Sequence, residues 1–139
     1  MSIAQFLIAQ APLPNDKQRK DISALIDSYS KARENSDTVL LKDILIDDVD
    51  QLVSTGEWRN GIRAAVDGML KSSANSPGTR TLKVEKIRMA NPNCAIVDCR
   101  YEIQNPGGTL RKMWSTFVVV SDKKTWKIAA IRNMLPEER

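Results

Sequence analysis

Apolar residues recur at helical spacing in the first third of the chain and at strand spacing in the second half. Asn15 or Asp16 can cap a helix that runs to about residue 35. Its apolar stripe consists of Ile22, Leu25, Ile26, Tyr29 and Ala32. Asp37 starts a shorter helix, which we expect to end by Ile46 because the acidic residues that follow oppose a helix C-terminus.

A short hairpin is predicted over residues 49–58, where a Ser-Thr-Gly turn separates two strands. Residues 59–78 then form another amphipathic helix, for which Asn60 is a candidate cap. Four long strands follow, over residues 80–90, 93–104, 109–121 and 126–135. In the first of them the alternation changes phase between Val84 and Ile87, which predicts a β-bulge near Glu85.

This order of elements predicts an α+β fold with one hydrophobic core. Helices must bury one face against the sheet, and long, bulged antiparallel strands curl. We therefore expect a cone, in which helices lie on the concave face of a curved antiparallel sheet and leave a pocket at the wide end. The domain is expected to span residues 15–139, with residues 1–14 as an N-terminal arm.

Composition excludes several classes of function. The formal net charge of +4 is spread along the chain, and aromatic residues make up only 5% of it without a base-stacking pattern, so no nucleic-acid role is expected. No apolar run reaches the ~20 residues of a membrane helix, and we expect a cytoplasmic protein. A trimmed export signal at the N-terminus is the weaker alternative.

The cysteines and the absence of histidine argue against metal or redox chemistry. Cys94 and Cys99 lie in one predicted strand with Cα atoms roughly 16 Å apart, too far for a disulfide. The chain contains no histidine, so zinc sites and Ser-His-Asp triads are not expected. Asp48 and Asp50 alone are weak evidence for a cation site. We expect no metal and no cofactor.

Three segments resemble the NTF2-like superfamily, most closely its SnoaL-like or DUF4440 (SgcJ/EcaC-type) group. They are Y-x-x-A-x-x-x-x-D from Tyr29 to Asp37, IDD at 46–48, and TFVVVSDKKTWKIAAIRNMLP at 116–136. The resemblance spans about residues 16–136 and implies the NTF2-like cone. It also implies a small hydrophobic or polyketide-like ligand, and for many members a homodimer formed through the outer face of the sheet.

The ketosteroid isomerases of this superfamily permit a comparison residue by residue. Tyr29 matches the position of their oxyanion donor, and Ser115 falls near that of their protonated acid. The position of their catalytic aspartate falls on Val53 or Ser54, and neither can act as a carboxylate base. The resemblance thus implies a hydrogen-bond donor in the pocket without the base that an isomerase needs.

The remaining candidates are ligand-binding residues and one acid. Met113, Ser115 and Phe117 share one face of a long strand that can line the pocket, and Trp58 and Asn133 can complete it. Asp98 either pairs with an arginine such as Arg100 or Arg111, or lines the pocket as the general acid or base of the sheet. Tyr29 either bonds a backbone carbonyl in the core or points its hydroxyl into the pocket.

Both faces of the strand at 109–121 are apolar enough to be buried. One face serves the core, and a second copy of the chain would cover the other, which includes Trp114 and Val118. The N-terminal arm, through residues 6–8, is the alternative cover. Two functions stay open: a small-molecule-binding protein that is a cofactor-independent isomerase, cyclase or dehydratase, or a non-catalytic homodimeric association module.

Overall fold

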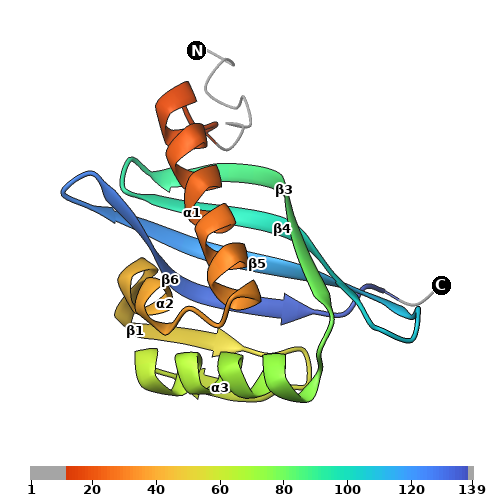
Figure 1. Cartoon of the computed structure of the whole chain (residues 1–139). Coiled ribbons are helices and arrows are strands. Elements are labelled where there is room, and N and C mark those ends of the chain that lie inside the picture. The colour runs from red at the N-terminus through yellow and green to blue at the C-terminus, as the bar shows by residue number, and fades with distance from the viewer. Residues whose placement is uncertain (1–11, 138–139) are drawn as a thin grey trace, which may run out of the picture.

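The computed structural model describes residues 12–137 and has three helices on one side of a six-stranded sheet (Figure 1). The helices are α1 (Asp16–Glu34), α2 (Thr38–Ile44) and α3 (Ile62–Asn75). The strands are β1 (Leu45–Leu52), β2 (Trp58–Asn60), β3 (Thr79–Asn91), β4 (Cys94–Gln104), β5 (Leu110–Asp122) and β6 (Thr125–Met134). The predicted α+β fold is confirmed, and residues 1–11, including the predicted arm contact at 6–8, lie outside the described residues.

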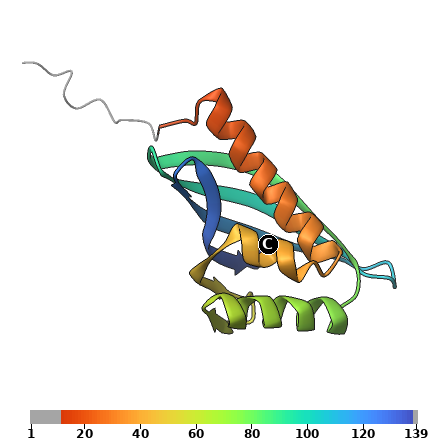
Figure 2. The same cartoon turned by 60° about the vertical axis from the view of Figure 1, so that its left-hand side comes forward.

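The sheet is curved, and the helices lie along its concave side (Figure 2). Its strand order is β2-β1-β6-β5-β4-β3. Neighbouring strands are antiparallel except β1 and β6, which run parallel and were not distinguished by the sequence pattern. The register of β3 against β4 shifts between Val84 and Lys86, so the predicted bulge near Glu85 is confirmed.

The helix starts follow the local sequence in two of three cases. The Asn15 side chain accepts a hydrogen bond from the Gln18 N–H at 2.8 Å, and the Asn15 N–H donates one to the Gln18 side-chain oxygen at 2.9 Å, which completes a capping box for α1. Asp37 caps α2 in the same way, through the Leu40 N–H. The predicted cap of α3 was wrong: Gly61, not Asn60, holds the N-cap position, with φ at +88° and no side-chain cap.

The structure decides which face of β5 is buried. Met113, Ser115, Phe117 and Val119 point toward the helices, while Trp114 and Thr116 lie on the outer face. Tyr29 of α1 packs edge-on against Phe117, with ring centroids 5.2 Å apart. The core therefore fills the interior of the cone between α1 and the middle of β5. Among residues 12–137, no helix combines the length and apolar character needed to cross a membrane.

Candidate functional site

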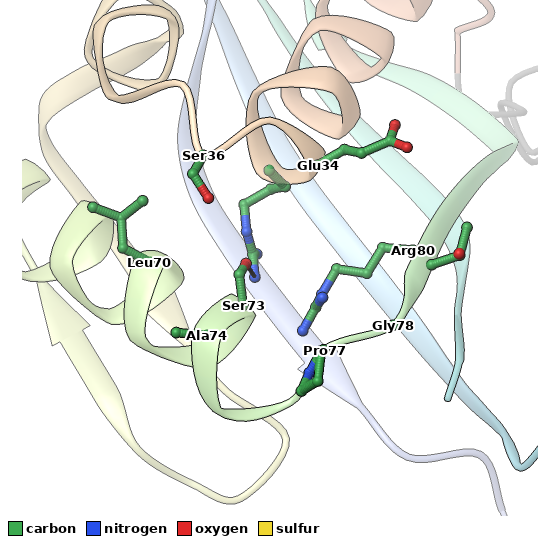
Figure 3. A pocket seen from close by; sticks show the side chains of 10 residues that line it. Glu34, Ser36, Leu70, Ser73, Ala74, Pro77, Gly78 and Arg80 are labelled. Atoms are coloured by element: carbon green, nitrogen blue, oxygen red, sulfur yellow. Dashed lines mark hydrogen bonds between the residues drawn. The ribbon is translucent and has the colours of Figure 1, made fainter. Parts of the chain in front are cut away.

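A cavity of about 290 Å³ opens where the C-terminal ends of α1 and α3 meet the first residues of β3 (Figure 3). None of the residues that the sequence predicted to bind a ligand lines it. The residues that line it are Arg33, Glu34, Ser36, Leu70, Ser73, Ala74, Pro77, Gly78, Thr79 and Arg80. Polar side chains and a small apolar wall thus share a space large enough for a small organic molecule.

Arg33 is the least expected residue of this cavity, because it is only 7% exposed. Its Nη1 donates a hydrogen bond to the Tyr29 hydroxyl at 3.0 Å, and its Nη2 lies 3.4 Å from the Ser73 hydroxyl. Its buried Nε has no hydrogen-bond partner, and within residues 12–137 no carboxylate forms an ion pair with it. A buried cation is thus held by neutral oxygens alone.

Arg80 reaches the same cavity from β3, and Figure 3 shows its side chain extending toward the end of α3. Its Nη2 donates to the Ser76 carbonyl oxygen at 2.9 Å and lies 3.4 Å from that of Ser72. These carbonyls belong to the last turn of α3, where cations are favourable. Its Nε is buried without a partner, and in the described part of the chain Arg80 forms no ion pair.

The Tyr29 hydroxyl therefore meets a guanidinium rather than a backbone carbonyl. Burial acts to lower the pKa of Arg33, but the Tyr29 and Tyr101 phenols more than offset it, and the pKa of Arg33 is raised. Burial raises the pKa of the Tyr101 phenol, although Arg33 and Arg80 act in the opposite direction. At physiological pH Arg33 carries its positive charge, as a guanidinium does throughout that range, and burial keeps the Tyr101 phenol neutral.

The predicted ligand-binding residues of β5 and β6 lie in the cone but are not among the residues that line this cavity. Ser115 donates a hydrogen bond to the Asn133 side-chain oxygen at 2.7 Å, so the two side chains partner each other. Phe117 packs under Tyr29, and Met113 belongs to a small cluster with Tyr101 and Ile103. Phe117 and Met113 thus approach the two arginines only through Tyr29 and Tyr101.

Asp98 and Trp58 lie on the outer face of the sheet, away from the cavity. Asp98 accepts a hydrogen bond from the Thr116 hydroxyl at 2.7 Å. Arg100, one of its predicted partners, pairs instead with Glu85 at 2.8 Å. Trp58 is 51% exposed, and Arg132 covers its ring at 4.7 Å. Neither residue is placed to contact a ligand held by Arg33.

Sequence reasoning missed Arg33, Ser73 and Arg80. A signal was present for Arg33, which stands four residues after Tyr29 and so continues the apolar stripe of α1 at helical spacing. Arg80 and Ser73 carry no such signal, because their meeting depends on how α3 turns into β3. Within residues 12–137, no group of three or more histidine, cysteine, aspartate or glutamate side chains is arranged to hold a metal ion.

No protein-family model and no curated protein sequence matches the chain. Solved structures do match. An NTF-2 like protein of unknown function from Shewanella oneidensis is 18% identical with a TM-score of 0.71, over 84% of this chain and 98% of that one. A domain of unknown function with a cystatin-like fold from Nostoc punctiforme is 15% identical with a TM-score of 0.79, over 90% of this chain and 81% of that one.

A putative calcium/calmodulin dependent protein kinase II association domain from Xanthomonas campestris is similar as well. It is 16% identical with a TM-score of 0.73, and the match covers 94% of this chain and 96% of that one. Identities this low establish architecture and leave activity open. The chain has the NTF2-like fold.

Proposed function

We propose that this protein binds a small organic molecule in the cavity between α1, α3 and β3. The observation that carries the proposal is the buried Arg33 side chain, which lines this cavity with its Nε unpaired and with no carboxylate partner in the described residues. Buried polar groups without partners are rare in folded proteins, and ligand pockets typically combine an apolar wall with a few polar groups. The size of about 290 Å³ favours a ligand at the small end of the expected range.

A ligand screen by thermal shift tests this proposal. The tryptophans Trp58 and Trp114 lie on the outer face, so their fluorescence does not report on the cavity. The variant Ala74→Phe fills the cavity from an exposed position on α3, and Ala64→Phe adds the same ring to an exposed position of that helix outside the cavity. Compounds that stabilise the wild type and Ala64→Phe but not Ala74→Phe support the proposal. A screen without such compounds contradicts it.

A cofactor-independent isomerase, cyclase or dehydratase activity is a finer form of this proposal. Such reactions need a positioned acid or base. Among the described residues that line the cavity, Glu34 carries a carboxylate and is the candidate acid or base. It is exposed at the end of α1. If the bound compound is turned over, Glu34→Gln should lower kcat at least tenfold, and an unchanged kcat would exclude Glu34 as the base. We also propose that the protein is cytoplasmic and that it belongs to the SnoaL-like group.

A homodimeric association module is the second candidate, and the outer face of the sheet favours it. Trp58, Trp114 and Met134 are all between 39% and 51% exposed on this face. Trp114 and Met134 line a hollow of about 340 Å³, together with Asp98 and Lys86. Exposed tryptophans grouped on one sheet face are typical of a surface that a partner covers.

Sedimentation analysis tests the dimer directly. Trp114→Lys places a charge in the middle of this outer face, whereas Val39→Lys makes the same kind of change at a residue of α2 that is 81% exposed and remote from it. We expect the wild type and Val39→Lys to sediment as dimers and Trp114→Lys to sediment as a monomer. A wild-type monomer at all concentrations would contradict the second candidate and leave the ligand proposal untouched.

A further inference from the structure

The two arginines of the cavity indicate what kind of molecule it binds. An arginine carries five N–H donors and no acceptor, and it stays charged even when buried. Arg33 uses one donor on the Tyr29 hydroxyl and one, at longer range, on Ser73. Arg80 donates through Nη2 to the carbonyl oxygens of Ser76 and Ser72, its side chain also interacts with the Tyr101 phenol, and its buried Nε makes no hydrogen bond in the described residues.

Two cations in one cavity are unfavourable unless something compensates them. Like charges repel, and burial removes the water that would screen them. The C-terminal dipole of α3 compensates Arg80 in part, because that side chain bonds the last carbonyls of the helix. Arg33 lies in the last turn of α1, where the helix dipole also favours a cation, and its guanidinium lies 5.8 Å from the centroid of the Tyr29 ring. It is the more buried of the two arginines, and no carboxylate within residues 12–137 forms an ion pair with it.

Glu34 does not supply the missing charge. It lies at the rim of the cavity, is exposed, and forms no ion pair within residues 12–137. Figure 3 shows its carboxylate turned away from Ser73 and Arg80. Solvent screens an exposed carboxylate in this position, so its attraction for the buried guanidinium is weak.

The rest of the cavity wall is apolar or small. Leu70, Ala74 and Pro77 form a short apolar surface next to the arginines. An inorganic anion would use the arginines and leave this surface in contact with water. A molecule with an anionic head and an apolar body matches both parts of the wall.

We propose that the cavity binds a small organic carboxylate, with its head group on Arg33 and Arg80 and its apolar body against Leu70, Ala74 and Pro77. A guanidinium matches a carboxylate with two parallel N–H···O bonds, which makes this pairing stronger than a bond between neutral groups. The Ser73 hydroxyl adds a donor on the same side of the cavity. This inference rests on the proposed function and specifies its ligand class.

Calorimetry with a series of straight-chain acids from acetate to octanoate, each paired with its neutral amide, tests the inference. Inorganic phosphate is the third probe. The variants are Arg33→Gln and Arg80→Gln, and Arg19→Gln is the control, because it removes the same charge from an exposed position of α1. We expect an acid of middle length to bind best and its amide to bind at least about tenfold more weakly.

We expect each cavity variant to lower the affinity for the acid about tenfold or more, while Arg19→Gln leaves this affinity unchanged. Amides that bind as well as their acids would overturn carboxylate recognition. Binding of phosphate alone, lost in both cavity variants, would replace the organic acid with an inorganic anion. If no acid binds, but the thermal-shift screen finds neutral ligands whose binding is abolished by Ala74→Phe, this inference fails and the proposed function stands.

A second measurement does not depend on whether the Arg33 variant folds. Phenylglyoxal modifies accessible arginines, and mass spectrometry locates the modified residues in the wild-type protein. The best-binding acid should slow modification of Arg80 relative to Arg19, and its amide should not. Equal rates at Arg80 with and without the acid would contradict the inference.

Discussion

Removal of a single oxygen from the core tests how Arg33 is held. Tyr29→Phe deletes the hydroxyl that accepts the hydrogen bond from Arg33 Nη1 at 3.0 Å. The ring itself is unchanged, so its edge-on contact with Phe117 at 5.2 Å persists. The variant therefore isolates one hydrogen bond to a buried cation.

The expected cost follows from that bond. A hydrogen bond to a charged group contributes about 1.5–3 kcal/mol. A buried donor that loses its acceptor has given up its bond to water without gaining a protein bond in return. Arg33 is 7% exposed, so its Nη1 loses its acceptor at a largely buried position. We expect Tyr29→Phe to lower the free energy of unfolding by about 1.5–3 kcal/mol, or the Tm by roughly 5–10 °C.

Urea unfolding of a double-mutant cycle measures the interaction itself. The cycle consists of Tyr29→Phe, Arg33→Met and the double variant, and Met replaces the guanidinium with a flexible apolar chain of similar length. We expect a coupling energy of about 1 kcal/mol or more between the two residues. A coupling below about 0.5 kcal/mol, or a Tyr29→Phe variant as stable as the wild type, would refute the reasoning that this hydroxyl holds Arg33 in place.

Four further changes have expected outcomes. Gly68→Ala should lower the free energy of unfolding in urea by about 1 kcal/mol or more, because the added Cβ would overlap the Arg59 side chain. Alanine has the better helix propensity, so a gain in stability would contradict this packing. Asn15→Ala removes the capping box of α1 and should cost about 1 kcal/mol, whereas Asn93→Ala, a change in the exposed turn before β4, should have a smaller effect. Burial, with smaller contributions from Asp98 and Glu85, raises the pKa of the Cys99 thiol to about 12, so Ellman's reagent at pH 8 should react with Cys94 and not with Cys99 until the protein unfolds. Because the pKa of Cys99 is higher in the folded form, the neutral buried thiol contributes its full stabilisation below pH 9, and this contribution is lost as the pH rises toward 12. The free energy of unfolding should therefore fall by up to about 1.4 kcal/mol per pH unit between pH 9 and pH 12, and Cys99→Ala should reduce this slope.

Periodicity and cap chemistry carried most of the fold prediction. The stripe of α1, the bulge in β3 and the alternation of β4 and β5 are local patterns, and each appears in the structure where the sequence placed it. The parallel pairing of β1 with β6 is not local, because it joins residues about eighty positions apart and leaves no mark on either segment. The start of α3 was misplaced since Gly61 caps it through its backbone conformation rather than a side chain.

The candidate site was harder to predict for a physical reason. Tyr29 was placed correctly on the buried stripe, but its partner Arg33 belongs to a residue type that is rarely buried, and so it was not included. Asp98 was selected because a carboxylate in an apolar strand needs an explanation, and the structure supplies one in the Thr116 hydroxyl on the outer face. Alternation shows which residues of a strand share a face, but it does not show which of the two faces is turned toward the core. That choice depends on the register of the strand in the sheet.

Chemical-shift mapping of the wild-type protein tests the central claim most directly. Titration with the straight-chain acids should move the backbone amide resonances of Ser36, Ser73, Gly78 and Thr79 around the cavity, in one saturable process. The amides of Trp58 and Thr116 on the outer face should stay in place. Shifts confined to the outer face, or no saturable shift at the cavity with any acid or amide, would contradict the account.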